Sequence, residues 1–140
     1  MKSHSRHFTV LAALSALLAI ALFIPGLGGG FLLDDEPTIT ENRTVQITDL
    51  SAGSLTQAAY AFNVGGGTRA LPMLTFGLDY WRAGLDPAAY KTTNLLIHAL
   101  TTLALAGFFR LLLASAGWPP RQTDFMAVAL AMAWALQSPG

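Results

Sequence analysis

The sequence contains no cysteine and little charge. Without cysteine the chain forms no disulfide, no cysteine metal site and no thiol nucleophile. Only 11% of its 140 residues are charged, less than half of the roughly 25% that is usual in soluble domains. The formal net charge is +0, so the basic excess of a nucleic-acid-binding protein is missing. The composition therefore argues against a water-soluble globule and against a nucleic-acid partner, and the length allows one domain at most.

Apolar residues are instead concentrated in long segments. They make up 53% of the chain, and residues 8–24 read FTVLAALSALLAIALFI without a charge. A bilayer core needs about 20 such residues, so we expect a membrane span near residues 8–25 that ends at Pro25. Lys2 and Arg6 precede it, which places the amino terminus in the cytoplasm. The alternative is a cleaved signal peptide of a secreted precursor, although this apolar core is longer than usual for one.

Two further spans are predicted near residues 90–115 and 123–138. The helix of the first begins at Asp86 and Pro87, and at about 1.5 Å per residue it would be about 45 Å long, more than the membrane core. Arg110, near its far end, is expected to reach the headgroups. Residues 125–136 (FMAVALAMAWAL) follow a hairpin at residues 118–122 and are too few to span alone. We therefore expect an all-α fold, a fragment of a polytopic membrane protein with about three transmembrane helices.

The interval between the first two spans, residues 28–89, is predicted to be an extracytoplasmic loop. Residues 28–92 hold seven acidic and four basic side chains, and the positive-inside rule places such a segment outside. A capping box at residues 54–57 predicts a short helix through Phe62. A second short helix is expected over residues 71–83, with an apolar face that lies on the membrane or packs on other spans and a polar face that includes Asp79 and Arg82.

Adjacent acids follow the first span directly, at Asp34, Asp35 and Glu36. Because neighbouring carboxylates repel, the pKa of at least one should rise. Such a group can act as a general base on an acceptor hydroxyl, or the cluster can hold a divalent cation through its oxygens. The other interpretation is that these acids are solvated determinants of topology.

Asn94, His98 and Thr101 share one face of the second span, and Arg69 precedes the second short helix. Polar groups inside a span should face other helices or a wet cavity. His98 could bind an anionic head group, or Asn94 and His98 could simply hold helices together. Arg69 could bind a lipid phosphate, or it could neutralise Asp34, Asp35 or Asp79.

Together these segments resemble a family. FLLDDEPTI at residues 31–39, Asn42, RALPMLTF at 69–76, GLDP at 84–87, YK at 90–91 and NLLIH at 94–98 occur in one order. The chain resembles the amino-terminal part of bacterial polytopic membrane proteins with tetratricopeptide repeats, which are similar to protein O-mannosyltransferases and belong to the GT-C class of glycosyltransferases. One departure is that Ala70 and Leu71 separate Arg69 from Pro72, where the family usually has Arg-Pro.

The resemblance implies that residues 1–140 are part of a multi-span enzyme of the cell inner (plasma) membrane. Such an enzyme transfers a sugar from a polyprenyl-phosphate donor to a protein or glycan acceptor outside the cytoplasm. It maps the catalytic base onto Asp35 or Asp34, with Asp35 favoured, and it maps substrate-binding roles onto Arg69, Asn94 and His98. The donor-binding spans and the repeats are absent from these residues, so we expect this fragment alone to be inactive. The alternative is a non-enzymatic membrane scaffold or assembly subunit that binds a partner helix through Asn94 and His98.

Overall fold

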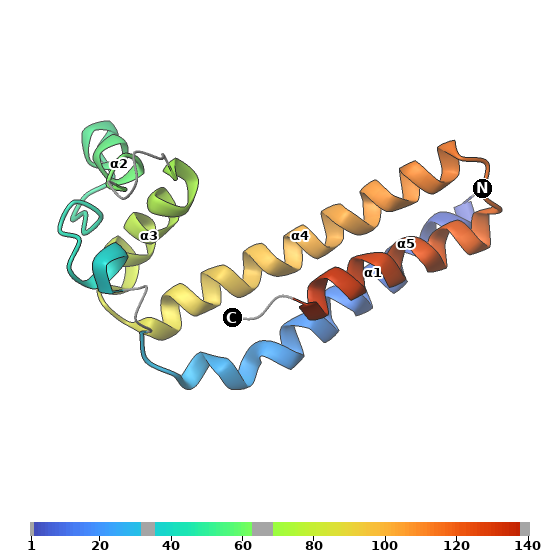
Figure 1. The fold of residues 1–140 in the computed structure, drawn as a ribbon, viewed down its shortest axis with the longest axis horizontal. Coiled ribbons are helices and arrows are strands. Elements are labelled where there is room, and N and C mark those ends of the chain that lie inside the picture. Colours follow the sequence, from blue (N-terminus) through green and yellow to red (C-terminus); the bar gives the residue numbers. More distant parts are fainter. Residues whose placement is uncertain (1, 32–35, 63–68, 138–140) are drawn as a thin grey trace. The chain divides into compact units, whose positions relative to one another are not determined.

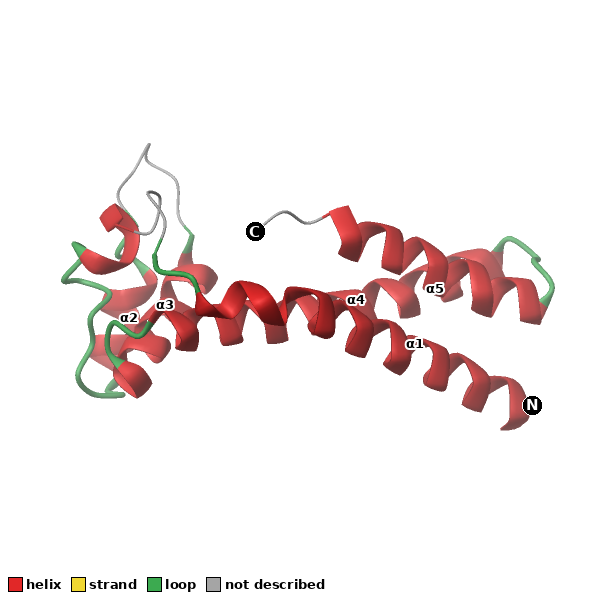
Figure 2. Ribbon diagram, turned by 90° about the horizontal axis from the view of Figure 1, so that it is seen from below, coloured by secondary structure: helices red, strands yellow, loops and turns green. Residues whose placement is uncertain are grey.

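The computed structural model describes residues 2–31, 36–62 and 69–137, and these residues form helices and loops without a strand (Figures 1 and 2). The expected all-α fold is therefore confirmed. The chain divides into two compact units. We call Met1–Pro25 with Asn94–Gly140 the three-helix unit, and Gly26–Thr93 the loop unit. In chain order, the helical elements of both units are α1 (Lys2–Phe23), a 3-10 turn (Ile24–Gly28), a π turn (Glu36–Thr40), α2 (Ala52–Ala59), α3 (Ala70–Ala83), α4 (Pro87–Ser115) and α5 (Pro120–Gln137).

The ends of the long helix α4 follow from local chemistry. Asp86 precedes its first residue, and one carboxylate oxygen accepts a hydrogen bond from the Ala88 N–H at 3.1 Å. Pro87 has no N–H to satisfy and its φ angle already suits a helix. At the other end Gly117 has a φ of 80°, a conformation that glycine adopts without a steric penalty. The predicted start of this helix is thus confirmed, and its end lies within one residue of the expectation.

Small side chains form the interior of the three-helix unit. Ala12 of α1, Ala106 of α4 and Ala131 of α5 are buried together, with Phe8, Leu105 and Val128 packed against them. The other buried positions are also mostly alanine, serine or threonine, and the hydroxyls of Ser15 and Thr102 donate to carbonyls of their own helices. Small residues allow helix backbones to approach closely, which is the usual packing of helices within membranes.

The large aliphatic side chains of the same helices point outward. Leu14 and Leu17 of α1 are 58% and 60% exposed, and Leu100 and Leu111 of α4 are 65% and 72% exposed. In water, each of these side chains would forgo about 1.5–3 kcal/mol relative to burial. This pattern, with small residues inside and leucine outside, is the reverse of the arrangement in a water-soluble helical bundle.

Two helical segments are long and apolar enough to cross a membrane, Arg6–Gly28 and Pro87–Ser115. They coincide with the first two predicted spans. The third predicted span corresponds to α5, which begins at Pro120 rather than at residue 123. Arg121 and Asp124 in its first turns make this helix less apolar than the other two. Among the described residues it therefore does not join the helices that are long and apolar enough to cross a membrane.

Arg110, which the sequence analysis expected to reach the headgroups, has partners within the chain. Its Nε donates to a carboxylate oxygen of Asp124 at 2.7 Å, and its guanidinium lies 4.6 Å from the centre of the Phe8 ring. Asp124 is buried and Arg110 is about one-third exposed. The pair joins α4 to α5, because a buried carboxylate is stable only with a partner. The sequence analysis had overlooked Asp124.

The loop unit has a small core of its own. Its buried apolar residues come from the segment after the π turn and from α2 and α3: Val45, Ile47, Ala58, Ala61 and Met73. Gly77 of α3 allows α2 to approach, since a Cβ at this position would lie 2.9 Å from the Ala58 Cβ. Gly84, with a φ of 63°, ends α3.

Two expectations about the loop unit were wrong in detail. The first short helix is capped by Ser51, whose hydroxyl accepts from the Ser54 N–H at 3.2 Å, so it begins before the proposed capping box and ends at Ala59. The second helix has the predicted bounds to within one residue, but Asp79 lies in its buried face together with Met73 and Gly77. Asp79 is buried because Arg82 and Thr93 supply hydrogen bonds there.

Candidate functional site

The two candidate catalytic acids, Asp34 and Asp35, lie outside the described residues. The chain just before them is described and is held to the start of α4. Lys91 Nζ donates to the carbonyl oxygens of Gly26 and Gly29 at 3.0 and 2.8 Å. These carbonyls follow the first span, where a cation is favoured by the orphan C=O groups of a helix end.

Tyr90, the neighbour of Lys91, completes this attachment. It is buried, and its hydroxyl donates to the Gly84 carbonyl at 3.0 Å. The Phe31 ring meets the Tyr90 ring edge-on, with centroids 5.4 Å apart. This contact fixes Phe31, which lies three residues before Asp34, in the loop unit. Sequence reasoning quoted Tyr90 and Lys91 as part of a motif but assigned them no role.

The segment after the acids is also fixed by side-chain amides. Asn42 Nδ2 donates to the Ala61 carbonyl at 3.0 Å, and its Oδ1 accepts from the Thr44 N–H. Gln46 Nε2 donates to the carbonyls of Ile39 and Thr40. Hydrogen bonds therefore tie the chain before residue 32 to α4 and the chain after residue 35 to Ala61, which follows α2.

Arg69 is exposed and immediately precedes α3. Its guanidinium lies 4.6 Å from the centre of the Phe62 ring, a cation–π contact worth about 0.5–1 kcal/mol at an exposed site. It makes no ion pair with another residue of the described part of the chain. Asp79 pairs with Arg82 and not with Arg69. The other two acids that Arg69 was expected to neutralise, Asp34 and Asp35, lie outside the described residues.

A polar cluster that the sequence analysis had not treated as a site lies where α3 meets the start of α4. Asp79 Oδ1 accepts from Arg82 Nη2 at 2.8 Å and from the Thr93 hydroxyl at 2.6 Å. Arg82 Nη2 also reaches the Ala89 carbonyl at 3.2 Å. The cluster borders an open hollow of about 280 Å³ lined by Thr75, Leu78, Asp79, Trp81, Arg82 and Thr93. The spacing of Asp79 and Arg82, three residues apart on a helix, was the signal available in the sequence.

In the three-helix unit, His98 is occupied by its own chain. Its Nε2 lies 3.1 Å from the Ala135 carbonyl oxygen, which can only accept, so Nε2 carries the proton. The ring stacks on Trp134, with centroids 5.0 Å apart, and meets the edge of Phe23. This arrangement matches the interpretation that His98 holds neighbouring helices together. Of its two ring nitrogens, Nδ1 is the one left for a ligand.

Asn94 is one helical turn before His98 on α4 and is exposed. The part of the chain that the structure describes provides no hydrogen bond to its side chain. Arg69 belongs to the loop unit, whereas Asn94 and His98 belong to the three-helix unit.

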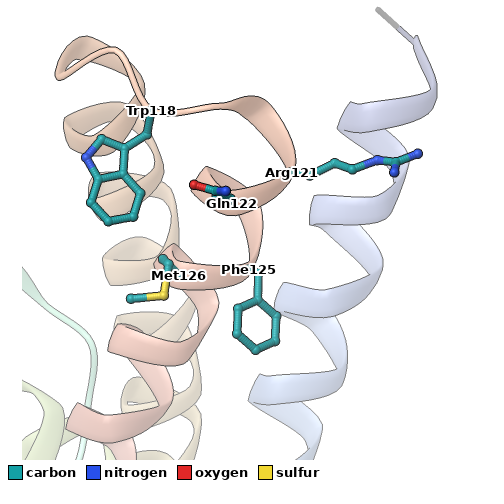
Figure 3. A pocket seen from close by; sticks show the side chains of 5 residues that line it. All are labelled: Trp118, Arg121, Gln122, Phe125 and Met126. Carbon is teal, nitrogen blue, oxygen red and sulfur yellow. The ribbon is translucent and has the colours of Figure 1, made fainter.

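A second hollow, of about 350 Å³, lies at the start of α5 and not at any predicted site residue. It is lined by Trp118, Arg121, Gln122, Phe125 and Met126, and Figure 3 shows the Arg121 side chain extending away from Trp118 and Met126. The charged and aromatic groups do not converge on one point. We therefore do not treat this hollow as the functional site.

Among the described residues, no three side chains of the histidine, aspartate and glutamate types gather as metal ligands. The chain matches no protein-family model, no curated protein and no solved structure.

Proposed function

We propose that the chain is the amino-terminal part of a membrane glycosyltransferase of the GT-C class that takes a sugar from a polyprenyl-phosphate donor. The proposal depends on the ordered segments that resemble this family, beginning with FLLDDEP at residues 31–37. The single structural observation that supports it best is the reversed packing of the three-helix unit, in which alanines are buried and leucines are exposed. Lipid is the solvent that stabilises such a surface.

The proposed orientation follows from the charges. Lys2 and Arg6 precede the first span, and Arg121 follows the turn after the second. The positive-inside rule then places the amino terminus and the turn between α4 and α5 in the cytoplasm, and it places the loop unit outside the inner membrane. The acceptor, a protein hydroxyl or a glycan, would meet the enzyme on that outer side.

The proposed chemistry uses Asp35 as a general base, with Asp34 as the other candidate. The carboxylate accepts the proton of the acceptor hydroxyl while that oxygen forms a bond to the anomeric carbon of the sugar. The bond from the anomeric carbon to the phosphate oxygen breaks, and polyprenyl phosphate leaves with the electron pair. Exposed Arg69 is available to pair bidentately with that phosphate.

The described contacts hold the chain before and after residues 32–35. Lys91 and Tyr90 hold residues 26–31, and Asn42 and Gln46 hold the chain that follows. A base must lie within hydrogen-bond reach of the proton that it removes, and fixed flanking residues are compatible with that requirement.

The test is Asp35→Asn in the full-length protein, with Glu41→Gln as the matched control. Glu41 is an exposed acid of the same unit, and its amide should leave activity unchanged. Transfer of radiolabelled sugar from polyprenyl phosphate in isolated membranes is the assay. Loss of a general base lowers the rate by about 10²–10⁴-fold. Full activity of both Asp35→Asn and Asp34→Asn would exclude the proposed role of the acids.

The scaffold alternative has less support in the described contacts. It requires a partner helix on the face of Asn94 and His98, but Nε2 of His98 lies 3.1 Å from the Ala135 carbonyl oxygen, and its ring contacts Trp134 and Phe23 of the same chain. If His98→Leu abolished binding of a partner protein while helix content was unchanged, the scaffold would become the better proposal.

A further inference from the structure

The polar cluster at the junction of α3 and α4 has a hydrogen-bond donor on Arg82 and an acceptor on Asp79 that the described residues do not use. Arg82 Nη2 makes the contacts to Asp79, Ala89 and Thr93. Its Nε and Nη1 make no hydrogen bond to the described part of the chain, although the guanidinium is half exposed. Nε–H and Nη1 lie on different edges of the guanidinium, so each can donate a single charge-assisted hydrogen bond to a phosphate oxygen.

The carboxylate of Asp79 is similarly half used. Oδ1 accepts both hydrogen bonds, from Arg82 and from Thr93. Oδ2 accepts none from the described residues, although the Asp79 side chain is only 5% exposed and borders the hollow. An ionised carboxylate has about four lone-pair sites, so this oxygen is suited to a cationic donor that enters the hollow.

The rest of the hollow is apolar and lies next to a helix of spanning length. Leu78 and Trp81 line it, and they are 39% and 49% exposed. Leu71, which is 76% exposed, lies about two turns before Leu78 on the same apolar face of α3. Only residues 84–86 separate α3 from α4, the helix that crosses the bilayer in the proposed function.

We propose that this hollow binds the headgroup of a zwitterionic phospholipid, of the type that carries a phosphate and a primary ammonium group. Arg82 donates one hydrogen bond to the phosphate through Nε, Asp79 Oδ2 accepts from the ammonium group, and Trp81 and Leu78 contact the start of the acyl chains. The pair of Asp79 and Arg82 has no net charge, which matches a headgroup of no net charge and disfavours an anionic one. This inference depends on the membrane location in the proposed function, not on sugar transfer.

The experiment compares lipids on the whole protein. The chain is purified in a mixed micelle that contains equal amounts of dioleoyl phosphatidylethanolamine and dioleoyl phosphatidylglycerol, and native mass spectrometry measures which lipid stays bound. We expect about a tenfold preference for phosphatidylethanolamine, the effect of one or two charge-assisted hydrogen bonds. Equal retention of the two lipids by the wild-type protein would overturn the inference without any variant.

Variants locate the site. Arg82→Lys keeps a cation beside Asp79 but removes the Nε–H donor, so the preference should fall to near one while helix content stays constant. Asp79→Asn should have the same effect, and Arg121→Lys, at an exposed position of α5, should have none. If the preference survives in Arg82→Lys and Asp79→Asn, the headgroup is bound elsewhere and the inference is wrong.

A separate measurement distinguishes this inference from the proposed function. Carbonate extraction of membranes shows whether the protein is inserted at all. An inserted protein without lipid preference contradicts only the headgroup site, whereas a protein that is extracted into water contradicts both.

Discussion

The ion pair between Arg110 of α4 and Asp124 of α5 should contribute measurably to the stability of the three-helix unit. The two side chains are joined by one hydrogen bond of 2.7 Å, and Asp124 is almost fully buried. A hydrogen bond to a charged group is worth about 1.5–3 kcal/mol. The contact of Arg110 with the Phe8 ring adds about 0.5–1 kcal/mol.

A double-mutant cycle separates the pair from its surroundings. Arg110→Gln and Asp124→Asn keep most of the side-chain volume but remove the charges. We expect a coupling energy of about 1.5–3 kcal/mol between the two positions. Asp124→Asn alone should cost more than the double variant, because it leaves Arg110 beside a neutral partner in a partly buried position.

The assay is reversible unfolding in mixed micelles, followed by far-ultraviolet circular dichroism. Arg121→Gln is the matched control, since Arg121 is exposed on the same helix as Asp124 and has no ion pair in the described part of the chain. It should change stability by less than about 0.5 kcal/mol. A coupling energy below about 0.5 kcal/mol would show that the pair is incidental to the packing of α4 and α5.

Two further predictions concern the loop unit. Gly77→Val should destabilise the packing of α2 on α3 by about 1–3 kcal/mol, because a Cβ there would already lie 2.9 Å from the Ala58 Cβ. Amide hydrogen exchange in α2 should therefore accelerate. Gly107→Val is the control and should not accelerate this exchange, since no described atom lies within 4 Å of its Cβ position. The Ser51 side chain, the Ser51 N–H and the Ser54 hydroxyl lower the pKa of Asp49, and of these the N–H and the Ser54 hydroxyl donate directly to its carboxylate. Because this pKa is lower in the folded than in the unfolded chain, the stabilisation is complete above the ordinary pKa of aspartate and is lost as the pH falls through the lowered value. Carbon-13 NMR of the Asp49 carboxyl should show the low pKa, and an ordinary pKa that is unchanged in Ser51→Ala would contradict this assignment.

Local rules were sufficient to predict most helix boundaries. Asp86, Pro87 and Gly117 mark the ends of α4, and Gly84 ends α3, because each acts through its own backbone or its nearest neighbours. The start of α2 was wrong because several hydroxyls compete to cap one helix. Ser51 has the support of Asp49, which accepts from the Ser51 N–H and the Ser54 hydroxyl, and this support depends on the folded turn.

Partners distant in sequence could not be predicted from spacing. Arg110 and Asp124 are on different helices, and Lys91 reaches carbonyls 62 and 65 residues away. Asp79 had seemed a solvent-facing group because its helix face is otherwise polar, but Thr93 on the next helix provides the hydrogen bond that allows its burial. For the candidate acids Asp34 and Asp35, the sequence is the whole basis of the prediction.

The central claim is that lipid, not water, surrounds the exposed leucines of the three-helix unit. Because the chain has no cysteine, Leu14→Cys, Leu100→Cys and Ser51→Cys each carry a single thiol. All three positions are exposed. In membrane vesicles, a water-soluble maleimide should label Ser51→Cys but leave Leu14→Cys and Leu100→Cys unlabelled until the membrane is dissolved and the chain unfolded. Rapid labelling of the two leucine positions in intact vesicles would contradict the account.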